Sequence, residues 1–314
     1  MRLTLALLIA AAATLLLTPL IARLARRIGA VDQPRGRHAH RLPTPTLGGL
    51  AIFAAFWLAI LVLRPWSGED PLKLFGLLSG AVLLVAVSVV DDLRGVSPAL
   101  RIVVQATAGA VAWAFGVRIE GLTQPFAPGP VTLAVSPVLS LPLTVLWVVV
   151  VVNALNWLDG LDGLAAGVAA IAGGTIAFVA WRHDQLLASV VGAAAAGACV
   201  GFLRYNFSPA RIFMGDTGAM FLGFVLACAA VMGLVKTTAA VAIAAPVPLL
   251  VLGVPLYDFL STIVKRLWAR QPIYSADRQH LHHRLQDLGW SDRTVVLVIW
   301  GVEGALCAIA VALR

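Results

Sequence analysis

The amino-acid sequence predicts an all-α polytopic membrane protein, and three observations lead to this prediction. Of its 314 residues 60% are hydrophobic and only 12% are charged, whereas soluble domains contain roughly 45–50% apolar and about 25% charged residues. The apolar residues fall in long uninterrupted runs, and a helix needs about 20 such residues to cross a bilayer. Basic residues cluster between the runs, as they do beside membrane-spanning helices. We therefore expect a single domain over residues 1–314.

Ten apolar segments approach the required length, so a bundle of about ten transmembrane helices is expected. Each should be helical because lipid offers the backbone no other hydrogen-bond partner. The segments lie near residues 3–21, 47–63, 72–90, 99–117, 138–156, 163–181, 185–203, 217–235, 239–261 and 294–312. The loops expected at one end of this bundle lie near residues 22–46, 91–98, 157–162, 204–216 and 262–293.

Charged residues divide unequally between the two ends of the expected bundle. Most of the 23 Lys and Arg residues fall on the side of the loops just named, so this side faces the cytoplasm and both termini lie outside. The net charge of +8 then indicates contact with anionic lipid and not with nucleic acid. The same side holds all histidines except His183, and the aspartates Asp32, Asp91, Asp92, Asp159, Asp162, Asp216, Asp258, Asp277, Asp287 and Asp292. A transporter would place such groups nearer the midplane, so the pattern favours chemistry at one face of an inner (plasma) membrane.

The first of these loops has more polar chemistry than a membrane anchor requires. Arg23, Arg26 and Arg27 are explained by the positive-inside rule alone. The histidines and the Pro and Gly residues that follow are not, and we expect His40 and Arg41 to contribute to a binding site.

Asp91 and Asp92 end the third apolar segment. Two adjacent carboxylates at a membrane boundary repel each other and are costly to desolvate unless a cation or donor compensates them. A solvated helix end is an equally good explanation of this pair taken alone. Arg101, at the start of the next segment, is a basic residue within reach.

The segment NALNWLDGLDGLAAG carries the most specific pattern in the chain. Asn153, Asn156, Asp159 and Asp162 recur at every third position between apolar residues. A purely structural role would require partners for two amides and two carboxylates at the edge of a bilayer. A functional site explains the stripe better.

Phe213 to Gly218 open the eighth segment with the sequence FMGDTG. Capping of the helix by Asp216 or Thr217 would explain the polar residues here. Together with the other acidic clusters on the same side, however, Asp216 suggests an oxygen-rich site suited to Mg²⁺.

Three histidines, His280, His282 and His283, lie in the loop between the last two segments, flanked by Arg278 and Arg284. Zinc binding is one interpretation, but no cysteine is near and the two arginines would repel a cation. Imidazole N–H groups beside guanidinium groups suit phosphate, so phosphate binding is favoured.

Taken together, these motifs resemble those of the polyprenyl-phosphate N-acetylhexosamine-1-phosphate transferases over nearly the whole chain. NALNWLDGLDGLAAG, GDTGAMFLG and HLHH are most similar to the bacterial undecaprenyl-phosphate N-acetylglucosaminyl-1-phosphate transferases that start envelope glycans such as O-antigen or wall teichoic acid. The branch that transfers phospho-MurNAc-pentapeptide typically has three consecutive histidines, where this chain has His-Leu-His-His.

The resemblance implies transfer of GlcNAc-1-phosphate from UDP-GlcNAc to undecaprenyl phosphate, with Mg²⁺ or Mn²⁺ as cofactor and a homodimeric assembly. It implies catalytic roles for Asp91, Asp92, Asp159 and Asp162, with the first two at the acceptor phosphate and the others near the nucleotide. Asn156 and Asp216 would bind the metal. The substrates would be bound by Asn153, Phe213, Gly215, Arg101, Arg278, His280, His282, His283, His40 and Arg41.

Two positions depart from the family pattern, since His38 and Ala99 stand where a basic lysine is usual. Two alternatives stay open at this point. One is a different donor, either another UDP-N-acetylhexosamine or the MurNAc-pentapeptide nucleotide. The other is a different class of protein, a transporter of lipid or nucleotide sugar.

Overall fold

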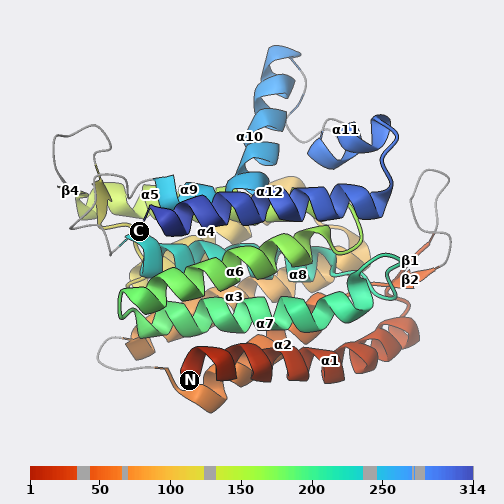
Figure 1. Cartoon of the computed structure of the whole chain (residues 1–314), viewed down its shortest axis with the longest axis horizontal. Coiled ribbons are helices and arrows are strands. Elements are labelled where there is room, and N and C mark those ends of the chain that lie inside the picture. Colours follow the sequence, from red (N-terminus) through yellow and green to blue (C-terminus); the bar gives the residue numbers. More distant parts are fainter. Residues whose placement is uncertain are drawn as a thin grey trace.

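The computed structural model describes residues 1–33, 43–65, 70–123, 132–235, 246–270, 272 and 280–313, and they form a helical bundle with two short hairpins (Figure 1). The helices of the first two thirds are α1 Arg2–Ile28, α2 Gly49–Leu63, α3 Asp70–Arg94, α4 Pro98–Ala114, α5 Pro137–Leu158, α6 Leu164–Arg182, α7 Leu186–Asn206 and α8 Gly215–Ala230. The rest are the π-helical segment η1 Val231–Val235, α9 Pro246–Val251, α10 Gly253–Trp268, α11 Leu281–Asp287 and α12 Asp292–Ala312. The hairpins pair β1 Val31–Asp32 with β2 Thr44–Pro45, and β3 Gly121–Thr123 with β4 Thr132–Ala134.

The long helices lie side by side, and the first and last run in opposite directions (Figure 1). Both chain termini therefore lie at one end of the bundle, and the β1–β2 hairpin lies at the other. The loops at the β1–β2 end are those in which the acidic residues were expected to gather.

Helix α8 forms the centre of the bundle. It packs against α2, α3, α5, α6 and α7, and every residue from Thr217 to Ala230 is buried. A helix that is apolar on all sides has no face for solvent and belongs in the core. Its N-terminus, which carries the FMGDTG sequence, is consequently fixed from several directions.

Helix α7 approaches α1 closely because its contact positions are small. A Cβ on Gly197 would lie 2.2 Å from the carbonyl oxygen of Leu7. Small residues allow two helix backbones to approach each other, which is how helices in lipid gain packing energy without a hydrophobic driving force.

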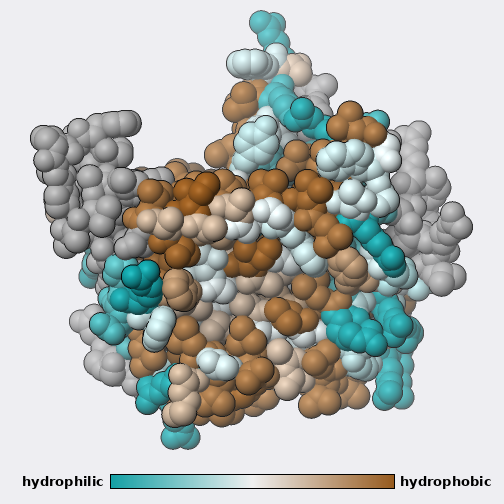
Figure 2. All heavy atoms as spheres, in the orientation of Figure 1, coloured by the Kyte–Doolittle hydropathy of each residue, from teal (hydrophilic) through white to brown (hydrophobic). Residues whose placement is uncertain are grey.

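Seven helices are long and apolar enough to cross a membrane among the described residues. They comprise α1, α3, α5, α6, α7, α8 extended by η1, and α12. Helix α2 is apolar but shorter, with 15 residues. Hydrophobic side chains cover the sides of the bundle, and hydrophilic ones gather at its ends (Figure 2). The chain is a multi-pass membrane protein, as predicted, although the expected count of ten spanning helices is not reproduced.

The ninth expected span, 239–261, is not one continuous helix. Its described part is divided at Leu252 between α9 and α10, and α10 projects out of the bundle (Figure 1). Pro255 has no N–H group for the helical ladder and Gly253 favours a change of direction, so the apolar run breaks here. The freed groups are satisfied by α12: the Val254 N–H donates to Glu303 Oε2 at 3.0 Å, and Cys307 Sγ lies 3.9 Å from the Val251 carbonyl oxygen.

Candidate active site

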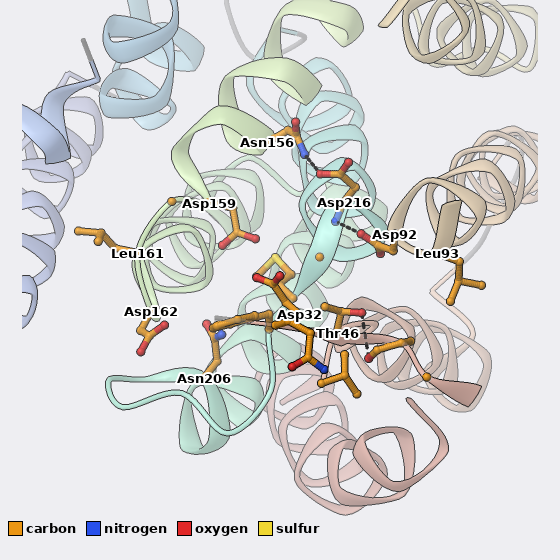
Figure 3. Close-up of a pocket in the computed structure, with 18 of the residues that line it drawn as sticks. Asp32, Thr46, Asp92, Leu93, Asn156, Asp159, Leu161, Asp162, Asn206 and Asp216 are labelled. Atoms are coloured by element: carbon orange, nitrogen blue, oxygen red, sulfur yellow. Dashed lines mark hydrogen bonds between the residues drawn. The ribbon is translucent and has the colours of Figure 1, made fainter. Parts of the chain in front are cut away.

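A polar cavity of about 650 Å³ opens at the β1–β2 end of the bundle. Its wall is built from the residues that follow α1, including β1, from Thr46 after β2 and from the ends of α3 and α5 (Figure 3). The α5–α6 turn, the α7–α8 loop and the starts of α8 and α12 complete it. Segments far apart in sequence thus meet at one place. The predicted site residues that line the cavity are Asp92, Asn156, Asp159, Asp162, Phe213, Gly215 and Asp216.

Asp92, near the end of α3, caps the N-terminus of the neighbouring helix α8. Its carboxylate accepts hydrogen bonds from the backbone N–H of Asp216 at 2.8 Å, the N–H of Thr217 at 3.1 Å and the Thr217 hydroxyl at 2.6 Å. The first N–H groups of a helix have no partner within it and favour negative charge. Asp92 therefore holds the end of α3 to the first turn of α8.

Gly215 is required at this junction for two reasons. Its φ of +71° is in the left-handed region that favours glycine. A Cβ at this position would also lie 2.6 Å from Asp92 Oδ2. Gly215 therefore permits the contact between α3 and α8 and also forms part of the cavity wall.

Asp91, the neighbour of Asp92 in sequence, pairs with the cation Arg101. Its buried carboxylate accepts from the Val96 N–H at 2.7 Å and from Arg101 Nη2 at 2.8 Å. Arg101 Nη1 also lies 3.0 Å from Asp216 Oδ2. Arg101 thus bridges two carboxylates from different helices, and Asp91 lies beside the cavity without lining it.

Asn156 and Asp216, predicted as metal ligands, are in direct contact. The Asn156 amide donates from Nδ2 to Asp216 Oδ1 at 2.7 Å (Figure 3). The amide oxygen of Asn156 is therefore directed away from this bond. The two residues lie on α5 and α8, 60 positions apart in sequence.

Asp159, in the turn between α5 and α6, lies across the cavity from Asp216 and Asp92 (Figure 3). Within the described residues it has no hydrogen-bond partner. Burial raises the pKa of Asp159 to about 7, and the nearby carboxylates of Asp216, Asp92 and Asp162 add to the shift. An acidic group in this setting is stabilised by a bound cation. Asp162, by contrast, accepts a bond from the Ala210 N–H at 2.8 Å.

The histidines pack behind the α5–α6 turn and do not line the cavity. His280 Nδ1 lies 2.8 Å from Asp258 Oδ2, and the other oxygen of Asp258 accepts from the Leu281 N–H at 2.6 Å. His282 lies against Gly160, where a Cβ would come within 2.5 Å of its Nε2 atom. Burial, followed by the nearby His283, lowers the pKa of His282 to about 3, so the ring is neutral.

The remaining predicted residues are not seen at the cavity wall. Asn153 pairs with Gln105 inside the bundle, donating from Nδ2 to Gln105 Oε1 at 2.5 Å, and does not line the cavity. His40, Arg41 and Arg278 lie outside the described residues.

Sequence reasoning missed several residues that shape the site. Asn206 accepts from the Gly163 N–H at 3.1 Å and donates to the Ile212 carbonyl at 3.0 Å, so it joins two loops of the cavity wall. Asp258 positions His280, and Gln105 holds Asn153. Each is a single polar residue at or inside an apolar segment, where a polar group needs a specific partner. This isolated position is the signal by which each residue could have been found.

The side-chain oxygens of this site fit a hard divalent cation whose remaining ligands come from the substrates. No group of three or more His, Cys, Asp or Glu close enough to hold a metal occurs in the part of the chain that the structure describes. Mg²⁺ is usually held by one or two carboxylates, with water and substrate phosphates completing its shell. The Asp159 carboxylate, which accepts no hydrogen bond from another described residue, and the oxygens of Asp216 and Asn156 meet that requirement.

Fold and site together define a membrane-embedded enzyme class whose acidic cavity suits a metal ion and phosphorylated substrates. The sequence pattern of glycosyl transferase family 4 matches residues 74–234, which include most of the cavity wall. The chain belongs to this family. The resemblance inferred from the motifs is confirmed.

Named relatives extend the match over the whole chain. The chain is 34% identical over 313 residues to the probable undecaprenyl-phosphate N-acetylglucosaminyl 1-phosphate transferase of Bacillus subtilis, covering 100% of this chain and 85% of the relative. It is 36% identical over 324 residues to the decaprenyl-phosphate N-acetylglucosaminephosphotransferase of Mycobacterium tuberculosis, covering 93% and 77%. It is 32% identical over 352 residues to a phospho-N-acetylmuramoyl-pentapeptide-transferase of a Mycobacterium species, covering 97% and 94%.

Proposed function

We propose that this protein transfers GlcNAc-1-phosphate from UDP-GlcNAc to undecaprenyl phosphate, giving undecaprenyl-diphospho-GlcNAc and UMP. One observation carries the proposal: Asp92, Asn156, Asp159, Asp162 and Asp216 line a single cavity at one end of a membrane bundle. Such a cavity can receive a nucleotide from water and a phosphate headgroup from lipid. The names of the Bacillus and M. tuberculosis relatives support a polyprenyl phosphate acceptor and a GlcNAc-phosphate donor.

The reaction exchanges one phosphoanhydride bond for another. An oxygen of the lipid phosphate forms a bond to the sugar-linked phosphorus of UDP-GlcNAc. The bond from that phosphorus to the bridging oxygen breaks, and UMP leaves with the electron pair. All reacting groups are anionic, so charge neutralisation and alignment are the main tasks of the site.

In this proposal Asn156 and Asp216 would hold Mg²⁺, and the Asp159 carboxylate lines the same cavity. When bound, the ion neutralises phosphate charge and orients the phosphates for in-line displacement. Mn²⁺ favours the same oxygen ligands and would replace it. Phe213 and Asp162 line the cavity; in this proposal Phe213 stacks on uracil and Asp162 faces the nucleotide.

Arg101 and Asp91 are proposed to act at the acceptor phosphate. Arg101 is one-third exposed and already bridges Asp91 and Asp216, so it can offer charge to an incoming phosphate. A phosphate monoester has its second pKa near 6, and most of the acceptor therefore arrives as a dianion. In this proposal Asp91 positions Arg101. It needs to remove a proton only from the small fraction of acceptor phosphate that is still protonated.

The assembly and orientation form part of the proposal. The basic loops favour a cytoplasmic cavity with both termini outside, and Figure 1 shows the termini at the opposite end from the β1–β2 hairpin. His280, His282 and His283 would contribute through the loop they support, together with Arg278, His40 and Arg41. A homodimer in the inner membrane is proposed from the family resemblance.

Purified protein with UDP-GlcNAc, undecaprenyl phosphate and Mg²⁺ tests the proposal. UMP release should require both substrates and should stop when EDTA removes the metal. Release without lipid would identify a hydrolase, and movement of intact UDP-GlcNAc across a vesicle would identify a transporter.

A donor panel separates the remaining alternatives. UDP-GlcNAc, other UDP-N-acetylhexosamines and UDP-MurNAc-pentapeptide are offered in turn, and the lipid product is weighed by mass spectrometry. Preference for the pentapeptide donor would replace the proposed substrate with that of the third relative.

A further inference from the structure

A second cavity, of about 180 Å³, lies between the end of α1 and the α7–α8 loop. We call it the basic pocket, because Arg23, Arg26 and Arg211 line it. Among the described residues it shares no lining residue with the large cavity. Its remaining walls are mainly apolar and include Pro19, Tyr205 and Ile212.

The three arginines of the basic pocket have no counter-charge in it. All three are exposed, and among the described residues the pocket wall contains no carboxylate. None of them forms an ion pair with another described residue. Like charges that converge on one hollow repel each other unless an anion binds between them.

The walls of the basic pocket are held in place by specific contacts. Pro19 has no N–H group, so the carbonyl oxygen of Leu15 lacks its usual helical partner. The Tyr205 hydroxyl donates to that oxygen at 3.1 Å. The Arg211 N–H in turn donates to the Tyr205 carbonyl at 2.8 Å. Tyr205 therefore fixes both sides of the pocket, from α1 and from the loop.

An apolar track leads from the basic pocket along α1. Ala22 lines the pocket, and Leu15 and Leu8 follow it at intervals of seven residues, which places them on the same face of the helix. Leu15 is 38% exposed and Leu8 is 55% exposed. The surface thus combines a cationic rim with an apolar track that runs toward the middle of the membrane.

The positive-inside rule explains why Arg23 and Arg26 are basic, but it does not explain why they line one pocket together with Arg211 from another element. Arg27 lies at the same end of α1 and is exposed, but it does not line the pocket. It is a basic anchor of the ordinary kind. Arg23, Arg26 and Arg211 differ from it because they converge on one hollow from two separate elements.

We propose that the basic pocket binds the phosphate of an anionic phospholipid, with an acyl chain of that lipid along Leu15 and Leu8. Guanidinium groups recognise phosphate oxygens through charge-assisted hydrogen bonds. The apolar walls and track select a lipid over a free phosphate ion, because burial of methylene groups adds to the affinity.

Native mass spectrometry in detergent tests the proposal by titration with phosphatidylglycerol. The wild type should retain a tightly bound lipid, and Arg23→Gln/Arg211→Gln should weaken the affinity for that lipid about 30-fold. Arg27→Gln/Arg94→Gln loses the same formal charge from exposed positions outside the pocket and should keep the lipid bound. Equal loss in both variants would contradict the proposal, since it would show a diffuse field.

Two further arms define the ligand. Phosphatidylcholine should show no difference between the wild type and the pocket variant. Inorganic phosphate at millimolar concentration should not displace the lipid, and displacement would show an ion site instead. Thermal melting of both double variants near the wild-type temperature verifies that they are folded.

Discussion

Asp91 and Asp92 are neighbours in sequence but have different surroundings. Asp91 is paired with Arg101, which provides a counter-charge beside the cavity. Asp92 is occupied as a cap on α8 and accepts three hydrogen bonds there. The two carboxylates therefore have different roles. Asp91 positions the charge of Arg101 for the acceptor, and Asp92 fixes the helix that carries Asp216.

Replacement of the cap should reduce stability as well as turnover. Asp92→Ala leaves two N–H groups and the Thr217 hydroxyl without their acceptor, so the free energy of unfolding should fall by about 1–2 kcal/mol. Thermal melting in detergent without substrate measures this. Asp184→Asn, at an exposed position with φ of +56° that Asn tolerates, is the control. An unchanged melting temperature for Asp92→Ala would rule out the capping role.

Asp159 makes stability depend on pH. Its pKa is raised from 3.8 to about 7, so the folded state favours the protonated form. That contribution is fully present below about pH 4 and is lost as the pH rises through about 7. Asp159→Asn removes the titration, and the metal-free variant should be more stable than the wild type by ~2 kcal/mol at pH 8.

Melting curves of the metal-free protein at pH 5 and pH 8 measure the effect. The difference in melting temperature between Asp159→Asn and the wild type should increase with pH. Addition of Mg²⁺ at pH 8 should raise the melting temperature of the wild type more than that of the variant. A gap that is constant with pH would show that Asp159 does not titrate in this range.

At the scale of elements, the histidine loop supports the α5–α6 turn. His282 packs on Gly160, which adjoins Asp159. Gly160→Ala would place a Cβ 2.5 Å from the His282 ring, so either the turn or α11 must move. We expect a loss of about 1–3 kcal/mol in stability and a fall in turnover of at least about tenfold.

Gly174→Ala is the matched control, because a Cβ there would meet no atom within 4 Å. Its melting temperature and turnover should stay near those of the wild type. If Gly160→Ala behaves in the same way, then the contact with His282 does not position the turn.

The break between α9 and α10 depends on α12 in a similar manner. The buried Glu303 side chain accepts the Val254 N–H at the start of α10. Glu303→Leu would leave that N–H unsatisfied and should cost about 1–3 kcal/mol. Glu303→Gln keeps an oxygen acceptor, so its melting temperature should stay close to that of the wild type. Equal melting of the Leu and Gln variants would contradict this account.

At the scale of the whole molecule, hydropathy and loop charge predicted most of the bundle. Runs of apolar residues became helices, and their alternation placed Asp92, Asp159 and Asp216 at one end. The break at Leu252 could not be predicted in this way, because its backbone is satisfied by Glu303, 49 positions from Val254. A long apolar run with prolines has the hydropathy of a continuous span.

The candidate site was predictable where polar residues recur in a motif. Asn156, Asp159 and Asp162 stand out from the apolar residues around them and do line the cavity. Single polar residues with distant partners gave no such pattern, and Gln105, Asn206 and Asp258 were missed for this reason. The roles in metal binding and catalysis stay predictions.

Transfer of a sugar phosphate is tested by following the phosphorus atom that bears the sugar. UDP-GlcNAc labelled at that phosphorus is incubated with undecaprenyl phosphate, Mg²⁺ and either the wild type, Asp216→Asn or the control Asp184→Asn. The proposed function predicts that the wild type and the control move the label into the lipid product and release unlabelled UMP, whereas Asp216→Asn moves little or none. Label that stays with the nucleotide while the sugar reaches the lipid, or label released as free GlcNAc-1-phosphate, would contradict it.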